Sequence, residues 1–330
     1  MDRRIDLIKK KEELFINSIE DNIVLQDGCI PVYHSYNLDF ENNTLKSRIY
    51  DNFFSGSGVL IVRNAYSKEI MEDYNVWCEK MLGEVCDDPN FIHPKQKDKY
   101  LINNVIERMS STNPQLLINL LNNRCLTNII DILLGFAKIG SCTTHWIKPG
   151  GDRQISHVDY PIHVGSGKFW ENSSNKVNKL ITPYQLEQIL PYYSIQVLVA
   201  SDSMSKINGS TEVIPFSHHL PKIDLDILDG NTKQILEPHF KNVTLEKGDF
   251  LIFNRRLVHR GGKNISKFRR NSLIFQCVWL FGVGQEILNY DKIITNLEKS
   301  SSYNKLNQEE KQKLKMRLKG PYPIDVSQNA

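Results

Sequence analysis

The sequence contains no apolar run that approaches the roughly 20 residues needed to cross a bilayer. Residues 1–20 are too charged to form the apolar core of a secretory signal. An excess of one charge is also lacking, because 41 Lys and Arg stand against 38 Asp and Glu, so there is no electrostatic footprint for nucleic acid. We therefore expect a cytoplasmic protein whose partner is a small molecule, with no membrane and no nucleic acid bound. These absences leave the oligomeric state open.

Cysteine is scarce and scattered, which argues against a disulfide framework or a zinc site. None of the cysteines forms a CxxC pair, and residues 1–20 do not have the pattern of a secretory signal. We expect buried, reduced thiols at Cys29, Cys78, Cys86, Cys125, Cys142 and Cys277. Hydrophobic residues make up 40% of the 330, which is enough for a sizeable core and excludes a disordered, collagenous or coiled-coil chain.

The first 137 residues have the periodicity of helices. Apolar residues at helical spacing predict an amphipathic helix within residues 3–23. Ser67 is a candidate N-cap for a helix over 67–82, and residues 114–134 repeat the same spacing. We therefore predict that residues 1–137 form a mainly helical region that packs on the part that follows.

After Gly135 the pattern changes to short strands. Stretches rich in β-branched and aromatic residues, each bounded by Gly, Pro, Asn or Asp, occur at 139–147, 192–200, 211–214, 249–253 and 272–280. This pattern indicates a β-sandwich or barrel over residues 138–282. The polar stretch 165–191 interrupts it as an insertion, and residues 283–330 form a charged helical tail. Because no linker separates these parts, we expect one β-rich α+β domain.

The sharpest functional signal is the pair His157 and Asp159. An imidazole and a carboxylate two residues apart in what reads as a strand point to the same face. His259, which follows a later apolar segment, supplies a third candidate ligand. Two histidines and one carboxylate form the facial triad that holds non-haem Fe(II) with open positions. The HxD motif alone is weak, because a chain with nine histidines often contains one by chance and His157 could be an ordinary core histidine.

A basic block after His259 strengthens this interpretation. Arg269 and Arg270 lead from a turn-rich linker into an apolar strand. An arginine that faces the interior of a barrel is costly unless it meets an anion, and its guanidinium matches a carboxylate bidentately. The block therefore predicts an anion site near the triad.

Three ordered blocks of the sequence resemble the phytanoyl-CoA dioxygenase family. They are HVD at 157–159, NGSTEVIPFSHH at 208–219, and the stretch from KGDFLIF through HRGGKN to RRNSL at 247–273. The resemblance extends over residues 139–282, and three blocks in order are far more specific than one. Members of this family are Fe(II)- and 2-oxoglutarate-dependent oxygenases.

The resemblance implies a fold, cofactors and a ligand set. The fold is a double-stranded β-helix, a cupin-like jelly-roll, buttressed by helices. The cofactors are Fe(II), 2-oxoglutarate as cosubstrate and O2, with His157, Asp159 and His259 as the iron ligands. Arg270 matches the family arginine that binds the distal carboxylate of 2-oxoglutarate. The neighbouring Arg269 is the alternative candidate for this role, since strand alternation lets only one of the two arginines face inward.

Three further positions are singled out by the resemblance. Gln154 precedes the first ligand by three residues, and Thr211 lies in the family's Asn-Gly-x-Thr pattern, so both match cosubstrate-binding positions. A surface glutamine and a turn-capping threonine are the plain alternatives. Phe216 stands where the family usually has glycine, which puts the geometry of that loop in question while leaving the triad untouched.

The implied activity is oxidation of a C–H bond of a small molecule, with hydroxylation favoured and with decarboxylation of 2-oxoglutarate to succinate. Asp159 favours hydroxylation, because related halogenases carry a small residue there. The alternatives are a non-catalytic metal- or ligand-binding protein on the same barrel and a peptide-modifying oxygenase. Candidate substrate contacts lie near the ligands or in a lid formed by residues 165–191, and ordinary packing is the alternative for each of them. They are Trp146, Tyr160, His163, Phe169, Trp170 and Gln196.

Overall fold

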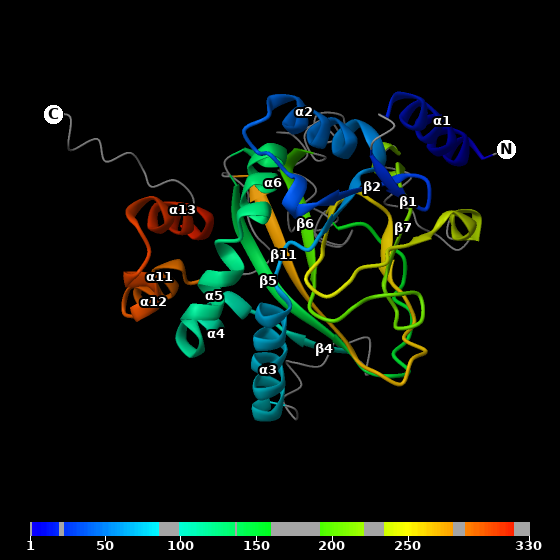
Figure 1. The fold of residues 1–330 in the computed structure, drawn as a ribbon. Helices are drawn as coiled ribbons and strands as arrows, with labels where there is room; N and C mark the ends of the chain where they lie inside the picture. The colour runs from blue at the N-terminus through cyan, green and yellow to red at the C-terminus, as the bar shows by residue number, and fades with distance from the viewer. Residues whose placement is uncertain are drawn as a thin grey trace, which may run out of the picture.

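Two β-sheets form the centre of the protein, which we describe from a computed structural model (Figure 1). The described residues are 2–19, 23–85, 99–135, 137–159, 192–220, 234–279 and 288–319. The larger sheet runs in the order β1 (Val24–Gln26), β2 (Ile30–His34), β3 (Val59–Arg63), β9 (Phe250–Asn254), β6 (Ser194–Ala200), β11 (Arg270–Trp279), β5 (Ala137–Ile147) and β4 (Lys99–Ile102). The smaller sheet consists of β10 (His259–Gly261), β7 (Thr211–Val213) and β8 (Lys241–Asn242). Neighbouring strands are antiparallel except β2 and β3.

Side chains of the large sheet alternate between two hydrophobic cores. On β6, Val197 belongs to the core under the helices, while Leu198 belongs to the core shared with the small sheet. Ile252 and Phe253 on β9 divide in the same way. Both faces of the sheet are therefore covered, which explains why these strands are apolar at nearly every position.

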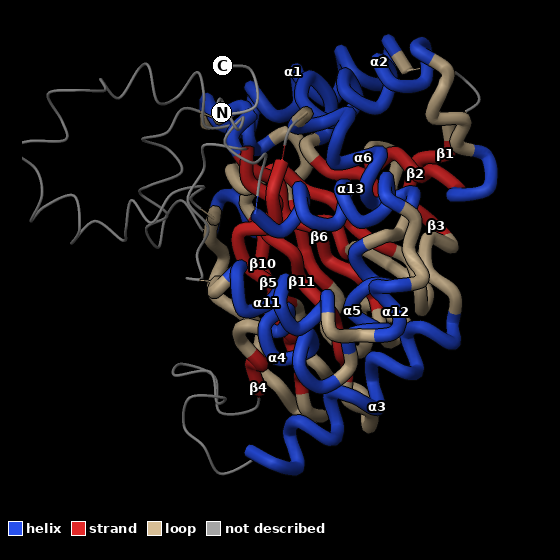
Figure 2. The backbone as a smooth tube through the Cα atoms, turned by 90° about the vertical axis from the view of Figure 1, so that its left-hand side faces the viewer, coloured by secondary structure: helices blue, strands red, loops and turns tan. Residues whose placement is uncertain are grey.

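Helices cover one face of the large sheet and both of its ends (Figures 1 and 2). They are α1 (Arg3–Ser18), α2 (Asn43–Asp51), α3 (Lys68–Val85), α4 (Val105–Thr112), α5 (Pro114–Leu121), α6 (Arg124–Leu134), α11 (Tyr290–Glu298), α12 (Ser301–Asn304) and α13 (Gln308–Lys319), with shorter helical turns η1 (Ser35–Asn37), η2 (Asn52–Ser57), η5 (Ser217–His219) and η6 (Glu237–His239). Buried Arg317 of α13 fastens the C-terminal helices to the sheet. It donates to the carbonyls of Ala137 at 3.1 Å and Thr127 at 3.2 Å, and it pairs with Asp131.

The N-terminal region does more than pack on the sheet. β3 pairs with β9, and β4 pairs with β5, so β1 to β4 extend the large sheet at both edges. The sequence analysis missed these strands. Each is three to five residues long, too short for a period-2 pattern to stand out between the helices.

The predicted helix over 114–134 is wrong as a single element, because two asparagines divide the stretch. The side chain of Asn113 accepts a hydrogen bond from the amide of Leu116 at 3.1 Å and caps α5. Asn123 accepts one from the amide of Leu126 at 2.9 Å and caps α6. Asparagine competes with the helical backbone in this way, so it starts helices better than it continues them.

Other expectations agree with the structure. The five predicted strands lie within about two residues of β5, β6, β7, β9 and β11. The described cysteines are buried and form no disulfide with one another. Within the described ranges, no helix combines the length and the apolar character that crossing a bilayer requires. The predicted insertion 165–191 and Cys86 lie outside the described residues.

Candidate metal centre and adjoining cavity

His157 and His259 face each other across an isolated β-bridge. The amide of His157 donates to the carbonyl of His259 at 3.0 Å, and the reverse hydrogen bond is 2.9 Å long. His259 begins β10, but residues 151–156 and 158–159 form no strand, so the strand expected around the HxD motif is wrong. The bridge supplies the alignment that a full strand was expected to provide.

Both imidazole rings are held in the same way, each by a carbonyl two residues earlier in the chain. Nδ1 of His157 lies 2.8 Å from the carbonyl oxygen of Ile155, and Nδ1 of His259 lies 2.9 Å from that of Leu257. A carbonyl oxygen only accepts, so each Nδ1 carries the proton and each Nε2 presents a lone pair. This is the arrangement by which proteins orient metal-binding histidines.

Asp159 completes a group of three donors. Its amide donates to the carbonyl of Arg255 at 2.8 Å, which fixes the backbone beside the bridge. Its carboxylate oxygens lie 3.8 Å from Nε2 of His157 and 3.6 Å from Nε2 of His259. All three candidate ligand atoms lie within 4.8 Å of one another, and no other group of His, Cys, Asp or Glu among the described residues is arranged to hold a metal ion. The donor set fits Fe(II) and leaves the side away from the protein ligands open.

Burial keeps one of the ligands neutral. Desolvation lowers the pKa of His259 to about 4, and the neighbouring His157 lowers it further while Asp159 opposes the change. Neutral imidazole is the form that binds a metal. The site is therefore prepared to accept a cation at neutral pH.

A cavity of about 260 Å3 adjoins the triad, between the two sheets. Alternate residues of three large-sheet strands line it together with β7 and the loop before His157. They include Thr143, His145, Ile147, Gln154, Gln196, Leu198, Thr211, Arg270 and Ile274. Thr143 and His145 were missed from the sequence, although alternation from Ile147 along the predicted strand 139–147 puts all three on one face.

Strand alternation separates the two candidate arginines. Arg270 faces the cavity, is 3% exposed, and has Nη1 at 3.6 Å from the sulfur of Met204. Its Nε has no hydrogen-bond partner among the described residues. Burial lowers the pKa of Arg270 to about 10, which leaves it charged at neutral pH. Arg269 points the other way, pairs with Glu79, and lies with its guanidinium 4.2 Å from the ring centroid of Trp146.

The prediction that Trp146 contacts the substrate is therefore wrong. Its ring lies beneath Arg269 in the core under the helices, because position 146 alternates with cavity-lining positions 145 and 147. Gln196 does line the cavity, and its Oε1 has no partner within the described ranges. The other candidate contacts, Tyr160, His163, Phe169 and Trp170, lie outside the described residues.

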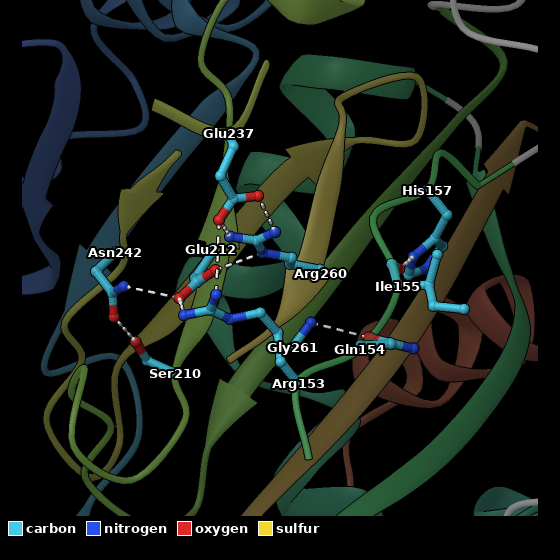
Figure 3. A network of polar contacts seen from close by, with 10 residues as sticks. All are labelled: Arg153, Gln154, Ile155, His157, Ser210, Glu212, Glu237, Asn242, Arg260 and Gly261. Atoms are coloured by element: carbon cyan, nitrogen blue, oxygen red, sulfur yellow. Dashed lines mark hydrogen bonds and ion pairs between the residues drawn. The ribbon is translucent and has the colours of Figure 1, made fainter. Parts of the chain in front are cut away.

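Gln154 and Thr211 lie on one wall of the cavity, on either side of Gly261. Oε1 of Gln154 accepts a hydrogen bond from the amide of Gly261 at 2.9 Å (Figure 3). Thr211 pairs with Gly261 between β7 and β10. The carbonyl oxygen of the glutamine thus helps to hold β10, and its amino end is a donor available to a ligand.

A partly buried ionic network supports the strand that carries His259 (Figure 3). The next residue, Arg260, pairs with buried Glu212 and donates two hydrogen bonds of 2.7 Å to Glu237. Its guanidinium also lies 3.8 Å from the ring centroid of Phe240. The network ties β10 to β7 and η6, and sequence reasoning missed it because the partners are distant along the chain.

Phe216 adopts the conformation that glycine would favour. Its φ is +66°, in the left-handed region, and its buried ring packs 5.6 Å from that of Phe15 on α1. The loop whose geometry the sequence analysis questioned thus accommodates a phenylalanine in the left-handed conformation. Contacts with α1 offset the backbone strain.

Comparisons with known proteins identify a family and a fold. A family model described as "Phytanoyl-CoA dioxygenase (PhyH)" matches residues 54–272. The epimerase SnoN from nogalamycin biosynthesis, in complex with Fe3+, alpha ketoglutarate and nogalamycin RO, has 12% identity and a TM-score of 0.53 over 79% of this chain and 91% of its own. The carbocyclase SnoK has 15% identity and a TM-score of 0.53 over 75% and 86%.

HygX from Streptomyces hygroscopicus, with nickel and 2-oxoglutarate bound, has 12% identity and a TM-score of 0.50 over 75% of this chain and 91% of its own. No curated protein sequence matches the chain. The similarities confirm the expected jelly-roll core with flanking helices, and identities this low describe the fold alone.

Proposed function

Because this chain belongs to the phytanoyl-CoA dioxygenase family of Fe(II)- and 2-oxoglutarate-dependent oxygenases, we propose that it hydroxylates a C–H bond of a small molecule. One observation carries the proposal. A triad of His157, Asp159 and His259 opens onto the same cavity as the buried guanidinium of Arg270.

We assign the three triad residues as the ligands of Fe(II). Nδ1 of each histidine is engaged by a carbonyl, so both rings offer Nε2 toward the carboxylate of Asp159. When bound, Fe(II) would supply the oxidative chemistry. In that reaction 2-oxoglutarate and O2 give succinate and CO2, and one oxygen atom of O2 is inserted into a C–H bond of the substrate. Asp159 supplies a carboxylate ligand at the position where related halogenases carry a small residue. We therefore favour hydroxylation over halogenation.

The remaining cavity residues hold and shield the reactants. Arg270 would pair with the distal carboxylate of 2-oxoglutarate, since a charged, buried guanidinium without a carboxylate partner is costly. The hydroxyl of Thr211 and the amino end of Gln154 are further candidate donors. Apolar side chains such as Phe253 and Ile274 exclude water from the same space.

The substrate is proposed to be a small molecule. The cavity, at about 260 Å3, is close to the lower end of small-molecule sites in size. A structure of HygX similar to this chain contains hygromycin B, and the SnoN complex contains nogalamycin RO. Gln196, with a carbonyl oxygen free among the described residues, is the candidate polar contact on β6.

The test is an anaerobic titration of the purified protein with Fe(II) and 2-oxoglutarate, monitored by the visible charge-transfer band of the chelate. We expect the band in the wild type and a loss of 2-oxoglutarate affinity of about 30-fold or more in Arg270→Ala, as for a buried charge pair that loses one partner. Arg269→Ala is the matched control, because it removes the neighbouring positive charge, which lies over the ring of Trp146 and outside the cavity lining.

Two results would count against the proposal. No band in the wild type would favour a binding protein on the same barrel. An equal loss of affinity in both arginine variants would show that overall charge, and not a carboxylate clamp, binds the cosubstrate. A band with the expected arginine dependence leads to a substrate screen by succinate release.

A further inference from the structure

A second buried arginine lies beside the triad, and its guanidinium has no hydrogen-bond partner among the described residues. Arg255 follows β9, is 1% exposed, and belongs to the largest fully buried side chains of the described residues. None of its three guanidinium nitrogens has a hydrogen-bond partner within the described ranges. The next residue, Arg256, is also buried but donates to the carbonyl of Leu220 at 2.7 Å, so burial in this loop does not by itself prevent pairing.

Arg255 is placed at the metal centre by its backbone and by its charge. Its carbonyl accepts the hydrogen bond from the amide of Asp159 at 2.8 Å. Burial lowers the pKa of Arg255, and the negative charge of Asp159 partly opposes that effect. The guanidinium is therefore desolvated and lies within reach of the charge of Asp159.

Asp159 alone does not neutralise this arginine in the loaded enzyme. As a metal ligand, Asp159 contributes its charge to Fe(II). The two positive charges of Fe(II) and the one of Arg270 are balanced by the two carboxylates of 2-oxoglutarate and the one of Asp159. Arg255 then remains as one uncompensated positive charge in a desolvated position, an arrangement that proteins avoid unless an anion arrives.

We propose that Arg255 receives an anionic group of the substrate, a carboxylate or a phosphate, and holds it beside the metal. The inference deepens the proposed function, on which it rests, by naming the substrate class. Arg255 and Arg270 then have separate tasks. Arg270 lies on β11 next to Met204, whereas Arg255 lies in the loop between β9 and β10 next to Asp159.

The guanidinium is suited to this task because its fork of donors matches the two oxygens of a carboxylate or phosphate. Binding at a fixed anion point would also orient the reacting C–H bond relative to the metal, since an anchored substrate has little freedom left to turn. A neutral molecule of the same shape would leave the arginine unpaired and so bind less tightly.

The test measures the affinity of the full chain, saturated with Zn(II) and 2-oxoglutarate, for three small probes by NMR titration. Acetate and methyl phosphate are the anionic probes, and acetamide is the neutral isostere of acetate. Saturation with 2-oxoglutarate occupies Arg270, and Zn(II) prevents turnover. We expect one anion to bind at least about tenfold more tightly than acetamide. The anion preferred distinguishes a carboxylate from a phosphate substrate.

Variants connect the preference to Arg255. Arg255→Gln should lose the preference, and Arg255→Lys should retain part of it because the charge remains. Arg153→Gln is the control, since Arg153 is half exposed, precedes cavity-lining Gln154 and pairs with Glu212 and Glu237. It should keep the wild-type preference.

No anion preference in the wild type, or the same preference in Arg255→Gln, would overturn the proposal. A Co(II) absorption spectrum adds a second readout. If Arg255→Gln alters that spectrum and leaves anion affinity unchanged, Arg255 positions Asp159 and does not meet the substrate. Failure of the oxygenase assignment is seen separately, as a missing charge-transfer band in the wild type.

Discussion

The backbones of His157 and His259 exchange two hydrogen bonds, 3.0 and 2.9 Å long, and the centroids of their rings lie 4.4 Å apart. Residues 102 positions apart in the chain are thus joined at one bridge, and each ring is oriented by a carbonyl of its own segment. The candidate metal centre therefore depends on this backbone bridge as well as on its side chains.

Removing a ligand should abolish tight metal binding. We expect Asp159→Ala and His259→Ala each to weaken Co(II) binding by more than about 100-fold, beyond the effect of losing an outer hydrogen bond to a ligand. Visible absorption during Co(II) titration measures the affinity. Asp152→Ala is the control, because Asp152 lines the same cavity but is exposed and pairs with Lys263. Retention of wild-type affinity in Asp159→Ala would refute the ligand assignment.

Loss of Arg260 should destabilise the fold. Arg260→Gln removes the main partner of Glu212, which is 4% exposed, and leaves a buried charge poorly compensated. We expect the free energy of unfolding to fall by about 3 kcal/mol, measured by urea denaturation. Arg153→Gln, which removes a 47% exposed partner of the same carboxylate, should change it by less than about 1 kcal/mol.

Adding Glu212→Gln to Arg260→Gln should recover part of the loss, because the uncompensated charge is then absent. If the double variant is less stable than Arg260→Gln, the hydrogen bonds of Glu212 to Asn242 and Arg153 matter more than its charge.

Alanine usually destabilises a protein less than glycine does, but at Phe216 we expect the glycine variant to be the more stable of the two. Either substitution loses the packing against Phe15, a cost of about 3–5 kcal/mol for a buried phenylalanine. Glycine also relieves the backbone at φ +66°, which is worth about 1 kcal/mol, whereas alanine does not. Thermal denaturation should therefore find Phe216→Gly more stable than Phe216→Ala. The opposite order would mean that the loop leaves this conformation when the ring is removed.

Acid should destabilise the protein through His219. Burial lowers the pKa of His219 to about 4, with Lys11 acting in the same direction, so between pH 6.5 and 4 the unfolded chain binds a proton that the folded chain does not. The stabilisation is complete above pH 6.5 and is lost as the pH falls toward 4. The slope per proton is up to about 1.4 kcal/mol per pH unit.

Urea denaturation at pH 7.5, 6.0 and 5.0 measures this dependence. His219→Gln should flatten it, and the neighbouring His218, whose pKa burial also lowers, should account for a further part. An unchanged slope in His219→Gln would show that the proton is taken up elsewhere.

Much of the site was accessible from the sequence because local pattern carries it. His157 and Asp159 are two residues apart, and the block from Lys247 to Leu273 contains both His259 and Arg270. The choice of Arg270 over Arg269 needed only strand alternation and a family spacing. Trp146 was misjudged, because nearness in sequence to a ligand says nothing about which face of β5 a residue occupies.

Features that depend on pairing between distant segments could not be read from the chain. Three contacts form only in the folded protein: the ion pair of Arg260 with Glu237, the ring contact of Phe15 with Phe216, and the backbone hydrogen bond from Asn254 to Gly58. The short strands β1 to β4 are similar, since each is stabilised by its neighbour in the sheet more than by its own residues.

The sequence by itself indicated several helices, the strands β5, β6, β7, β9 and β11, the candidate iron-binding residues and the resemblance to the family, because periodicity and short motifs are local properties of the chain. Only the tertiary structure decided that the guanidinium of Arg255 is buried without a hydrogen-bond partner among the described residues, and that a single bridge aligns His157 with His259. Burial and long-range register depend on which distant segments pack together. They therefore arise from the fold as a whole, and no short stretch of the sequence specifies them.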